Sequence, residues 1–229
     1  MNIDLQIKIA QIEKSVRASK LVMPNLGDFH RTYWENVVPL VGKEGLWMEF
    51  GVFRGRSIQK ISSLTKECVF GFDSFEGLHE YWDSDNPKGV YSSGGQIPKG
   101  AIRGDENHSM FDPSSTKNTE PWNPNIFLIK GYFEETLPIF LKLFPQHVAF
   151  MNIDSDLYSS CSTILSLLKD RIQDGTIICF DELLDYPDYR NGEIKAFAEF
   201  LLETGYDFEP LIYQSPQSEY TQACVKIIK

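Results

Sequence analysis

The sequence has few of the features that mark secreted, zinc-binding or nucleic-acid-binding proteins. Its four cysteines lie far apart and form no C-x-x-C pair, so we expect neither a disulfide framework nor a zinc site. Lysine and arginine together number 22 against 32 acidic residues, with no basic cluster, which argues against a nucleic-acid partner. No run of 18 apolar residues occurs, and charges interleave with apolar positions from Met1 to Lys14, so we predict no membrane partner and no signal peptide. The scattered cysteines predict a cytoplasmic location.

The length and composition predict a single domain over residues 1–229. With 229 residues, 42% of them hydrophobic, the chain can bury one sizeable core. Residues 1–45 are predicted to form an N-terminal helical extension, with an amphipathic helix over residues 2–18 and a second helix over residues 28–41. The first helix could cover one side of the domain or join two copies in a homo-oligomer.

Residues 46–64 carry the first functional signal. An apolar run that contains Glu49 is followed by Gly51 and Gly55, and a helical pattern begins at Ser57. This order predicts a strand, a tight turn and a helix start, where helix amides and exposed backbone can meet a polar ligand. The third glycine of the G-x-G-x-x-G pattern is missing, so a nicotinamide dinucleotide is not favoured, and a bare connection stays open.

The next apolar run ends at Asp73, which lies 22 residues after Gly51. One helix and one strand separate a glycine turn from a ribose-binding acid by about 20 residues in dinucleotide-binding folds. A carboxylate at this place can accept hydrogen bonds from both ribose hydroxyls. In the alternative interpretation Asp73 only caps the loop that follows it.

The remaining pattern predicts the fold class. Residues 79–125 are rich in glycine and proline but also in aromatic residues, which favours a lid-like insertion over a disordered segment. Strands and helices then alternate, and two final strands are joined by a short turn. We therefore predict an α/β fold with a doubly wound, Rossmann-like, mostly parallel seven-stranded sheet and an antiparallel C-terminal hairpin.

Acidic residues stand where the predicted strands end. Because the carboxyl ends of parallel strands meet at one edge, these side chains should share a rim. They are Glu49, Asp73, Asp154, Asp156, Asp181 and Glu182. Asp154, Asp181 and Glu182 offer three oxygen ligands from two adjacent strands, which suits Mg²⁺. Alternatively, these acids are loop caps or ion-pair partners of Lys130 or Arg190.

Five segments together resemble a known family. They are E-F-G-V-F-R-G from Glu49, F-D-S-F-E-G-L from Phe72, K-G-Y-F-E-E-T-L-P from Lys130, N-I-D-S-D-L-Y from Asn152 and F-D-E from Phe180. In this order and spacing the chain resembles class I S-adenosylmethionine-dependent methyltransferases. More narrowly, it is similar to the macrocin, mycinamicin and novobiocin-type sugar O-methyltransferase group.

The resemblance implies roles for particular residues. S-adenosylmethionine would contact Glu49, Gly51, Phe53, Gly55, Ser57, Asp73, Ser74, Phe75, Gly131, Phe133 and Asp154. Asp154, Asp181 and Glu182 would hold a divalent cation, and Asp156 would be the general base. His79 and His108, in or beside the lid, are competing candidates for the base.

The predicted function is O-methylation of a hydroxyl on a small molecule, such as a sugar or a glycosylated natural product, assisted by a divalent metal. Two alternatives stay open. The relatives carry Asp-Asp where this chain has Asp181-Glu182, which suggests a metal-independent methyltransferase that acts on another atom. The long insertion suggests a non-catalytic nucleotide-binding protein.

Overall fold

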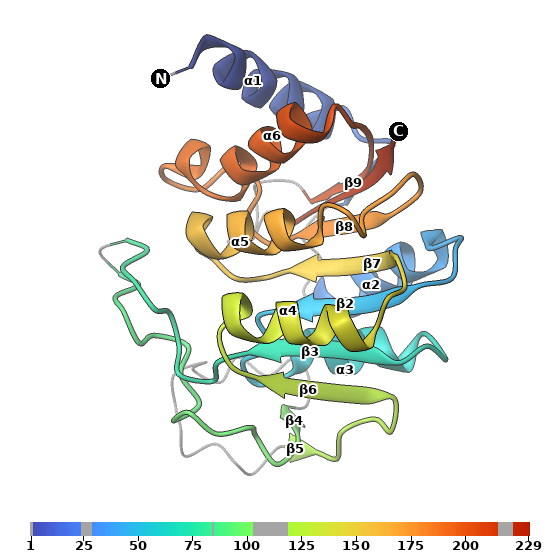
Figure 1. Ribbon diagram of the computed structural model, residues 1–229, viewed down its shortest axis with the longest axis vertical. Coiled ribbons are helices and arrows are strands. Elements are labelled where there is room, and N and C mark those ends of the chain that lie inside the picture. The colour runs from blue at the N-terminus through green and yellow to red at the C-terminus, as the bar shows by residue number, and fades with distance from the viewer. Residues whose placement is uncertain (1, 24–28, 84, 103–118, 215–221) are drawn as a thin grey trace.

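The computed structural model describes residues 2–23, 29–83, 85–102, 119–214 and 222–229. Eight strands form one sheet in the order β1-β9-β10-β8-β7-β2-β3-β6 (Figure 1). The strands are β1 (Leu21–Met23), β2 (Leu46–Phe50), β3 (Val69–Asp73), β6 (Ile126–Lys130), β7 (Val148–Ile153), β8 (Ile177–Phe180), β9 (Asp207–Gln214) and β10 (Ala223–Ile228).

The sheet confirms the predicted doubly wound architecture and its C-terminal hairpin. Strand β10 is antiparallel to both β8 and β9, whereas the other neighbouring strands pair in parallel. From β2 the chain winds outward through β3 to β6 and then returns to β7 on the other side of β2. The switch in direction therefore lies between β2 and β7, where ligands bind in open α/β sheets.

The predicted number of seven strands was wrong, because β1 adds an eighth. Residues Leu21, Val22 and Met23 pair in parallel with Ile212, Tyr213 and Gln214 of β9. A segment of three residues is too short to show an alternating pattern. Its pairing partner lies at the other end of the chain, so no local signal marks it as a strand. Because β1 lies within residues 1–45, the N-terminal extension is not entirely helical, contrary to the prediction.

Helices cover both faces of the sheet (Figure 1). Buried side chains of α1, α4, α5 and α6 pack on one face, and those of α2 and α3 pack on the other. Their bounds are α1 (Ile3–Arg17), α2 (Phe29–Val37), α3 (Arg56–Ser63), α4 (Phe133–Leu143), α5 (Tyr158–Leu168) and α6 (Glu193–Thr204). A 3₁₀ turn, η1 (Val38–Leu40), follows α2 and carries a proline near its start.

Helix α1 packs against α6 and β9 at the end of the sheet. Its apolar stripe of Leu5, Ile9, Ile12 and Val16 is buried within this chain, as the amphipathic pattern predicts. No described helix is long and apolar enough to cross a membrane.

The predicted insertion over residues 79–125 contains a short antiparallel pair, β4 (Ala101–Ile102) with β5 (Thr119–Glu120). The candidate base His108 falls outside the described residues. Figure 1 places the described start of the insertion beside the carboxyl ends of the central strands. This position agrees with the lid interpretation, which stays a prediction.

Candidate active site

Backbone hydrogen bonds tie together the carboxyl ends of five neighbouring strands. The bonds, of 2.9 to 3.0 Å, run from Gly131 N to Asp73 O, from Gly51 N to Phe72 O, from Asp154 N to Phe50 O and from Asp181 N to Ile153 O. Each bond continues the pairing one step past the strands. Residues that are far apart in sequence, from Gly51 to Asp181, therefore lie along one edge, as the strand ends predict.

The glycine turn after β2 depends on the absence of side chains. Gly51 has a φ of +88°, and a Cβ atom there would lie 1.6 Å from the carbonyl oxygen of Asp154. Gly55 has a φ of +77°, and its Cβ would lie 2.2 Å from the indole of Trp122. Both glycines are needed for conformation and for close approach. The turn therefore touches the end of β7 directly at the switch point.

Asp73 fixes this turn through backbone amides. Its Oδ2 accepts hydrogen bonds from Val52 N at 2.8 Å and from Phe53 N at 2.6 Å. Its Oδ1 accepts from Phe75 N at 2.6 Å. Asp73 therefore caps these loops, as the alternative interpretation of the sequence predicted. It does not exclude a ligand, because a carboxylate oxygen with one donor can accept a second hydrogen bond.

Glu49 is completely buried beneath the turn. Its Oε1 accepts a hydrogen bond from the Ser57 hydroxyl, while Oε2 has no partner of standard geometry among the described residues. Burial raises the pKa of Glu49 to about 8 and outweighs the hydrogen bonds from Ser57 and Asn152, which lower it. An open carboxyl oxygen of this kind suits a ligand with donor or cationic groups.

The other predicted cofactor residues occupy different environments. Phe75 is completely buried in the core on the α2 and α3 face, and its backbone carbonyl accepts hydrogen bonds from Ser93 N and Gly95 N. The Phe133 ring lies edge-to-face against Phe50, with centroids 5.6 Å apart. Ser74 accepts a hydrogen bond from Glu76 N at 3.1 Å, and Gly131 has a φ of +142°.

Three carboxylates gather beyond the glycine turn. Asp154, Asp156 and Glu182, called the acidic cluster below, each offer an oxygen within 4.8 Å of the others. Glu182 Oε2 is buried and has no hydrogen-bond partner among the described residues. Asp156 adopts a φ of +60°, a strained conformation of the kind that concentrates at functional sites. Oxygen ligands around an unsatisfied buried oxygen fit a hard cation such as Mg²⁺.

Asp181 is placed differently from its neighbour Glu182. The Asp181 carboxylate accepts a hydrogen bond from the Gln222 amide beside β10 and is not part of the acidic cluster. Consecutive residues leaving a strand point to opposite sides, so only one of this pair faces Asp154. Asp156, predicted as the general base, is the third member of the cluster.

Two further polar residues, Glu193 and Tyr186, lie beside the acidic cluster and were not predicted. Glu193 is completely buried at the start of α6, and its Oε2 accepts a hydrogen bond from Glu182 N at 3.2 Å. The other Glu193 oxygen and the Tyr186 hydroxyl have no partner among the described residues. An acid in the first turn of a helix is ordinary, so the sequence carried no signal for Glu193.

Burial dominates the electrostatics of these acids. It raises the pKa of Asp156 to about 7 and the pKa values of Asp154, Glu182 and Glu193 well above their ordinary range. Repulsion from neighbouring carboxylates, Asp181 first, raises all four further. The predicted crowding of acids on one rim is therefore present.

The start of the insertion reaches this side of the site. His79 Nε2 lies 3.2 Å from the Ser159 hydroxyl on α5, and the same hydroxyl donates a hydrogen bond to Glu80. The Trp82 ring lies edge-to-face against Tyr186, with centroids 5.9 Å apart. Burial, followed by the charges of Glu193 and Glu182, raises the pKa of Tyr186. A Cβ atom on Gly192, next to Glu193, would lie 1.9 Å from the Tyr186 hydroxyl, so the Trp82–Tyr186 pair stands beside the cluster.

The model of the family "Macrocin-O-methyltransferase (TylF)" matches residues 23–201. A comparison with curated proteins finds no match.

Several solved structures share the fold. The calicheamicin methyltransferase CalS11 is 22% identical, with a TM-score of 0.57 over 99% of this chain and 93% of that one. The O-methyltransferase NovP is 15% identical, with a TM-score of 0.55 over 97% of each chain. An O-methyltransferase from Bacillus cereus, in complex with S-adenosylhomocysteine (SAH), is 14% identical, with a TM-score of 0.50 over 100% and 92%.

Proposed function

Because this chain belongs to the macrocin O-methyltransferase (TylF) family of S-adenosylmethionine-dependent methyltransferases, we propose that it methylates a hydroxyl group of a sugar or a glycosylated small molecule. One observation carries the proposal. The glycine turn and the acidic cluster meet at the Gly51–Asp154 backbone contact, so a methyl donor and a hydroxyl acceptor can be held side by side.

The cofactor would lie across the turn after β2. Glu49 and the backbone from Gly51 to Gly55 would face its methionine part, and Asp73 would accept hydrogen bonds from its ribose. Gly131 and Phe133, at the end of β6 and the start of α4, would border the adenine. When bound, S-adenosylmethionine supplies a methyl group activated by its positively charged sulfur.

Asp154 and Glu182 would hold a divalent cation, which when bound lowers the pKa of a neighbouring acceptor hydroxyl. Asp181 would join them only by giving up its hydrogen bond to Gln222. The unpartnered Glu182 oxygen supports this assignment.

Asp156 is the proposed general base. Its carboxylate takes the proton from the acceptor hydroxyl while the oxygen forms a bond to the methyl carbon and the carbon–sulfur bond breaks. The products are the methyl ether, a protonated Asp156 and the neutral thioether SAH. The backbone at Asp156 holds the carboxylate at the cluster, within 4.8 Å of oxygens of Asp154 and Glu182.

The acceptor would bind between the acidic cluster and the Trp82–Tyr186 pair. Flat aromatic side chains beside hydrogen-bonding carboxylates suit a ring that carries several hydroxyl groups. CalS11 is described as a TDP-rhamnose 3'-O-methyltransferase, and its shared fold supports a sugar-type acceptor here.

Calorimetry with SAH and turnover by an Asp156→Asn variant test the proposal. We expect SAH to bind the wild type, and Asp156→Asn to bind it within twofold while losing methyl transfer. Mass spectrometry of a panel of glycosides and nucleotide sugars would report transfer as a methyl-sized mass gain. Asp170→Asn, an exposed acid beyond α5, is the matched control and should keep full activity. Absence of SAH binding would refute the proposal.

A metal-independent reaction is the second candidate, favoured by the engagement of Asp181 with Gln222. Turnover in excess chelator separates the two candidates. Loss of activity that Mg²⁺ restores supports the metal-assisted reaction, whereas unchanged activity supports the alternative.

A further inference from the structure

The segment between β8 and α6, residues 181–192, links the proposed active site to the N-terminal helix. The segment begins with Asp181 and Glu182. Glu193, which lies beside the acidic cluster, follows the segment directly as the first residue of α6. Leu183 and Leu184 are buried in the core. Tyr186 then lies beside the acidic side chains, since a Cβ atom on Gly192, the residue before Glu193, would lie 1.9 Å from the Tyr186 hydroxyl, while Asp185 and Tyr189 contact α1.

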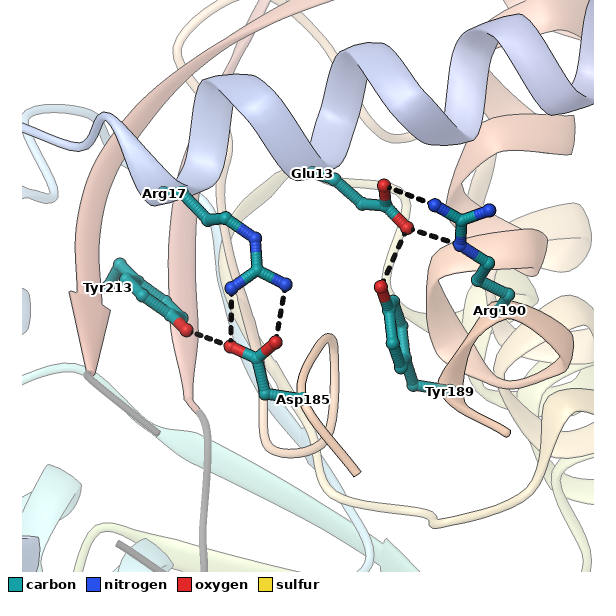
Figure 2. A network of polar contacts seen from close by, with 6 residues as sticks. All are labelled: Glu13, Arg17, Asp185, Tyr189, Arg190 and Tyr213. Atoms are coloured by element: carbon teal, nitrogen blue, oxygen red, sulfur yellow. Dashed lines mark hydrogen bonds and ion pairs between the residues drawn. The ribbon is translucent and has the colours of Figure 1, made fainter. Parts of the chain in front are cut away.

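Asp185 is held from two directions. Arg17 of α1 donates two hydrogen bonds to its carboxylate, one of them 2.9 Å long, and the Tyr213 hydroxyl of β9 donates another (Figure 2). Asp185 adopts a φ of +66°, which is costly for a residue other than glycine. Such a conformation persists where surrounding contacts impose it, and the two-point hydrogen bonding from Arg17 supplies such contacts.

A second contact lies one turn earlier on α1. Glu13 accepts hydrogen bonds from Arg190 Nε at 2.7 Å and Nη2 at 2.8 Å, and from the Tyr189 hydroxyl at 2.9 Å (Figure 2). The Tyr189 ring lies edge-to-face against Tyr186, with centroids 6.2 Å apart. The Glu13 side chain is only 12% exposed, whereas that of Arg190 is 54% exposed, so the carboxylate is shielded and the guanidinium reaches the solvent.

We propose that Arg17 and Glu13 are positioning residues of the active site, which hold residues 185–190 so that Tyr186 faces the acidic cluster and supports Trp82. Helix α1 is then part of the acceptor side of the site as well as a cover for the sheet. The proposal rests on the proposed function only in taking the acidic cluster as the acceptor side.

The test uses fluorine NMR of the full chain labelled with 5-fluorotryptophan. The Trp82 resonance is assigned by Trp82→Phe, and the resonances of buried Trp34 and Trp47 serve as internal references. Arg17→Ala and Glu13→Gln should shift or broaden the Trp82 resonance and leave the references unchanged. In Arg17→Lys the Trp82 resonance should lie between those of Arg17→Ala and the wild type, since lysine keeps the positive charge but cannot donate two parallel hydrogen bonds to Asp185.

Hydrogen exchange gives a second readout. We expect amides of residues 183–192 to exchange roughly tenfold faster in Arg17→Ala, at an unchanged rate in β2 and β7. The matched control is Lys20→Ala, which removes a cation three residues away that pairs with Glu209 of β9. It should change neither measurement.

Two results would overturn the proposal. One is an unchanged Trp82 resonance in Arg17→Ala and Glu13→Gln. The other is exchange that accelerates equally throughout the sheet, which would show a purely structural role. SAH affinity should stay within twofold of the wild type in every variant. A wild type that fails to bind SAH would refute the proposed function, while the NMR and exchange comparison would still decide this proposal.

Discussion

The two halves of the proposed site are built in opposite ways. On the β2 and β3 side, Asp73 is satisfied by three backbone amides, and the turn around Gly51 admits no side chain. On the β7 and β8 side, buried oxygens of Glu182 and Glu193 and the hydroxyl of Tyr186 have no partner among the described residues.

This difference suggests a division of work. The turn on the cofactor side is fixed by backbone hydrogen bonds to Asp73, and the open Oε2 of Glu49 lies beneath it, so this half can receive a ligand that is always the same. In the other half, buried polar groups without hydrogen bonds destabilise the free protein, and a bound ligand that pairs with them can offset that loss of free energy. We therefore expect the cofactor side to govern stability and the acceptor side to govern chemistry. Four experiments test that contrast.

The largest effect is expected from Gly51→Ala, which would disrupt the backbone contact between the two halves. The new Cβ would lie 1.6 Å from the Asp154 carbonyl oxygen, and φ is +88°. Since the obstacle is backbone, we expect a loss of more than about 3 kcal/mol in unfolding free energy. SAH binding should be abolished.

Gly205→Ala is the control that separates backbone strain at positive φ from a steric clash of the new Cβ atom. Gly205 has a φ of +71°, but no atom of the described residues lies within 4 Å of the new Cβ, so urea unfolding should report a loss of only about 1 kcal/mol. Equal losses in the two variants would contradict the argument.

The second effect concerns pH and Glu49, whose pKa of about 8 in the folded chain exceeds its ordinary value of 4.5. The folded state therefore binds the proton more tightly. The resulting stability is fully present below about pH 4.5 and is lost as the pH rises through about 8. By linkage, this group can contribute as much as roughly 5 kcal/mol to the change.

Glu49→Gln cannot lose a proton, so its unfolding free energy should decline less between pH 5 and 8 than that of the wild type. Urea unfolding across this range measures the difference. Parallel pH profiles would show that Glu49 is already charged in the folded protein.

The third effect is that of Asp73→Asn. The substitution replaces a charged acceptor of three amide hydrogen bonds, so we expect a loss of about 2 kcal/mol in stability. SAH affinity should fall on the order of 30-fold, and Mn²⁺ binding to the acidic cluster should persist. Asp83→Asn is the matched control, because Asp83 also accepts from two backbone amides but lies in the insertion. Calorimetry should find its SAH affinity unchanged.

The smallest effect is expected from Gly192→Ala on the acceptor side. Its Cβ would lie 1.9 Å from the Tyr186 hydroxyl, which is the far end of a side chain that can move. Stability should fall by about 1 kcal/mol or less, with SAH affinity unchanged, while the Trp82 fluorine resonance shifts. Gly42→Ala, with open space around it, is the control. A loss as large as that of Gly51→Ala would erase the contrast between the halves.

The cofactor half could be predicted from sequence because its signals are local. An apolar run, two glycines and an aspartate one helix and one strand later define the turn and its capping acid. Strands β2, β3, β7 and β8 are nearly continuous apolar runs, so their existence was readable as well.

The acceptor half depends on contacts between distant segments. Glu193 looks like a common helix-start residue, and its burial follows only from the position of α6 over the strand ends. Which of Asp181 and Glu182 faces Asp154 depends on Gln222, some 40 residues later. Strand β1 escaped prediction for the same reason, since its partner is β9.

The pairing of Leu21–Met23 with β9 also protects the molecule. Without it, the amides and carbonyls along Ile212, Tyr213 and Gln214 would form an open border that could recruit strands from other chains. A chain shortened past Met23 would therefore be prone to self-association, even with its proposed active site intact.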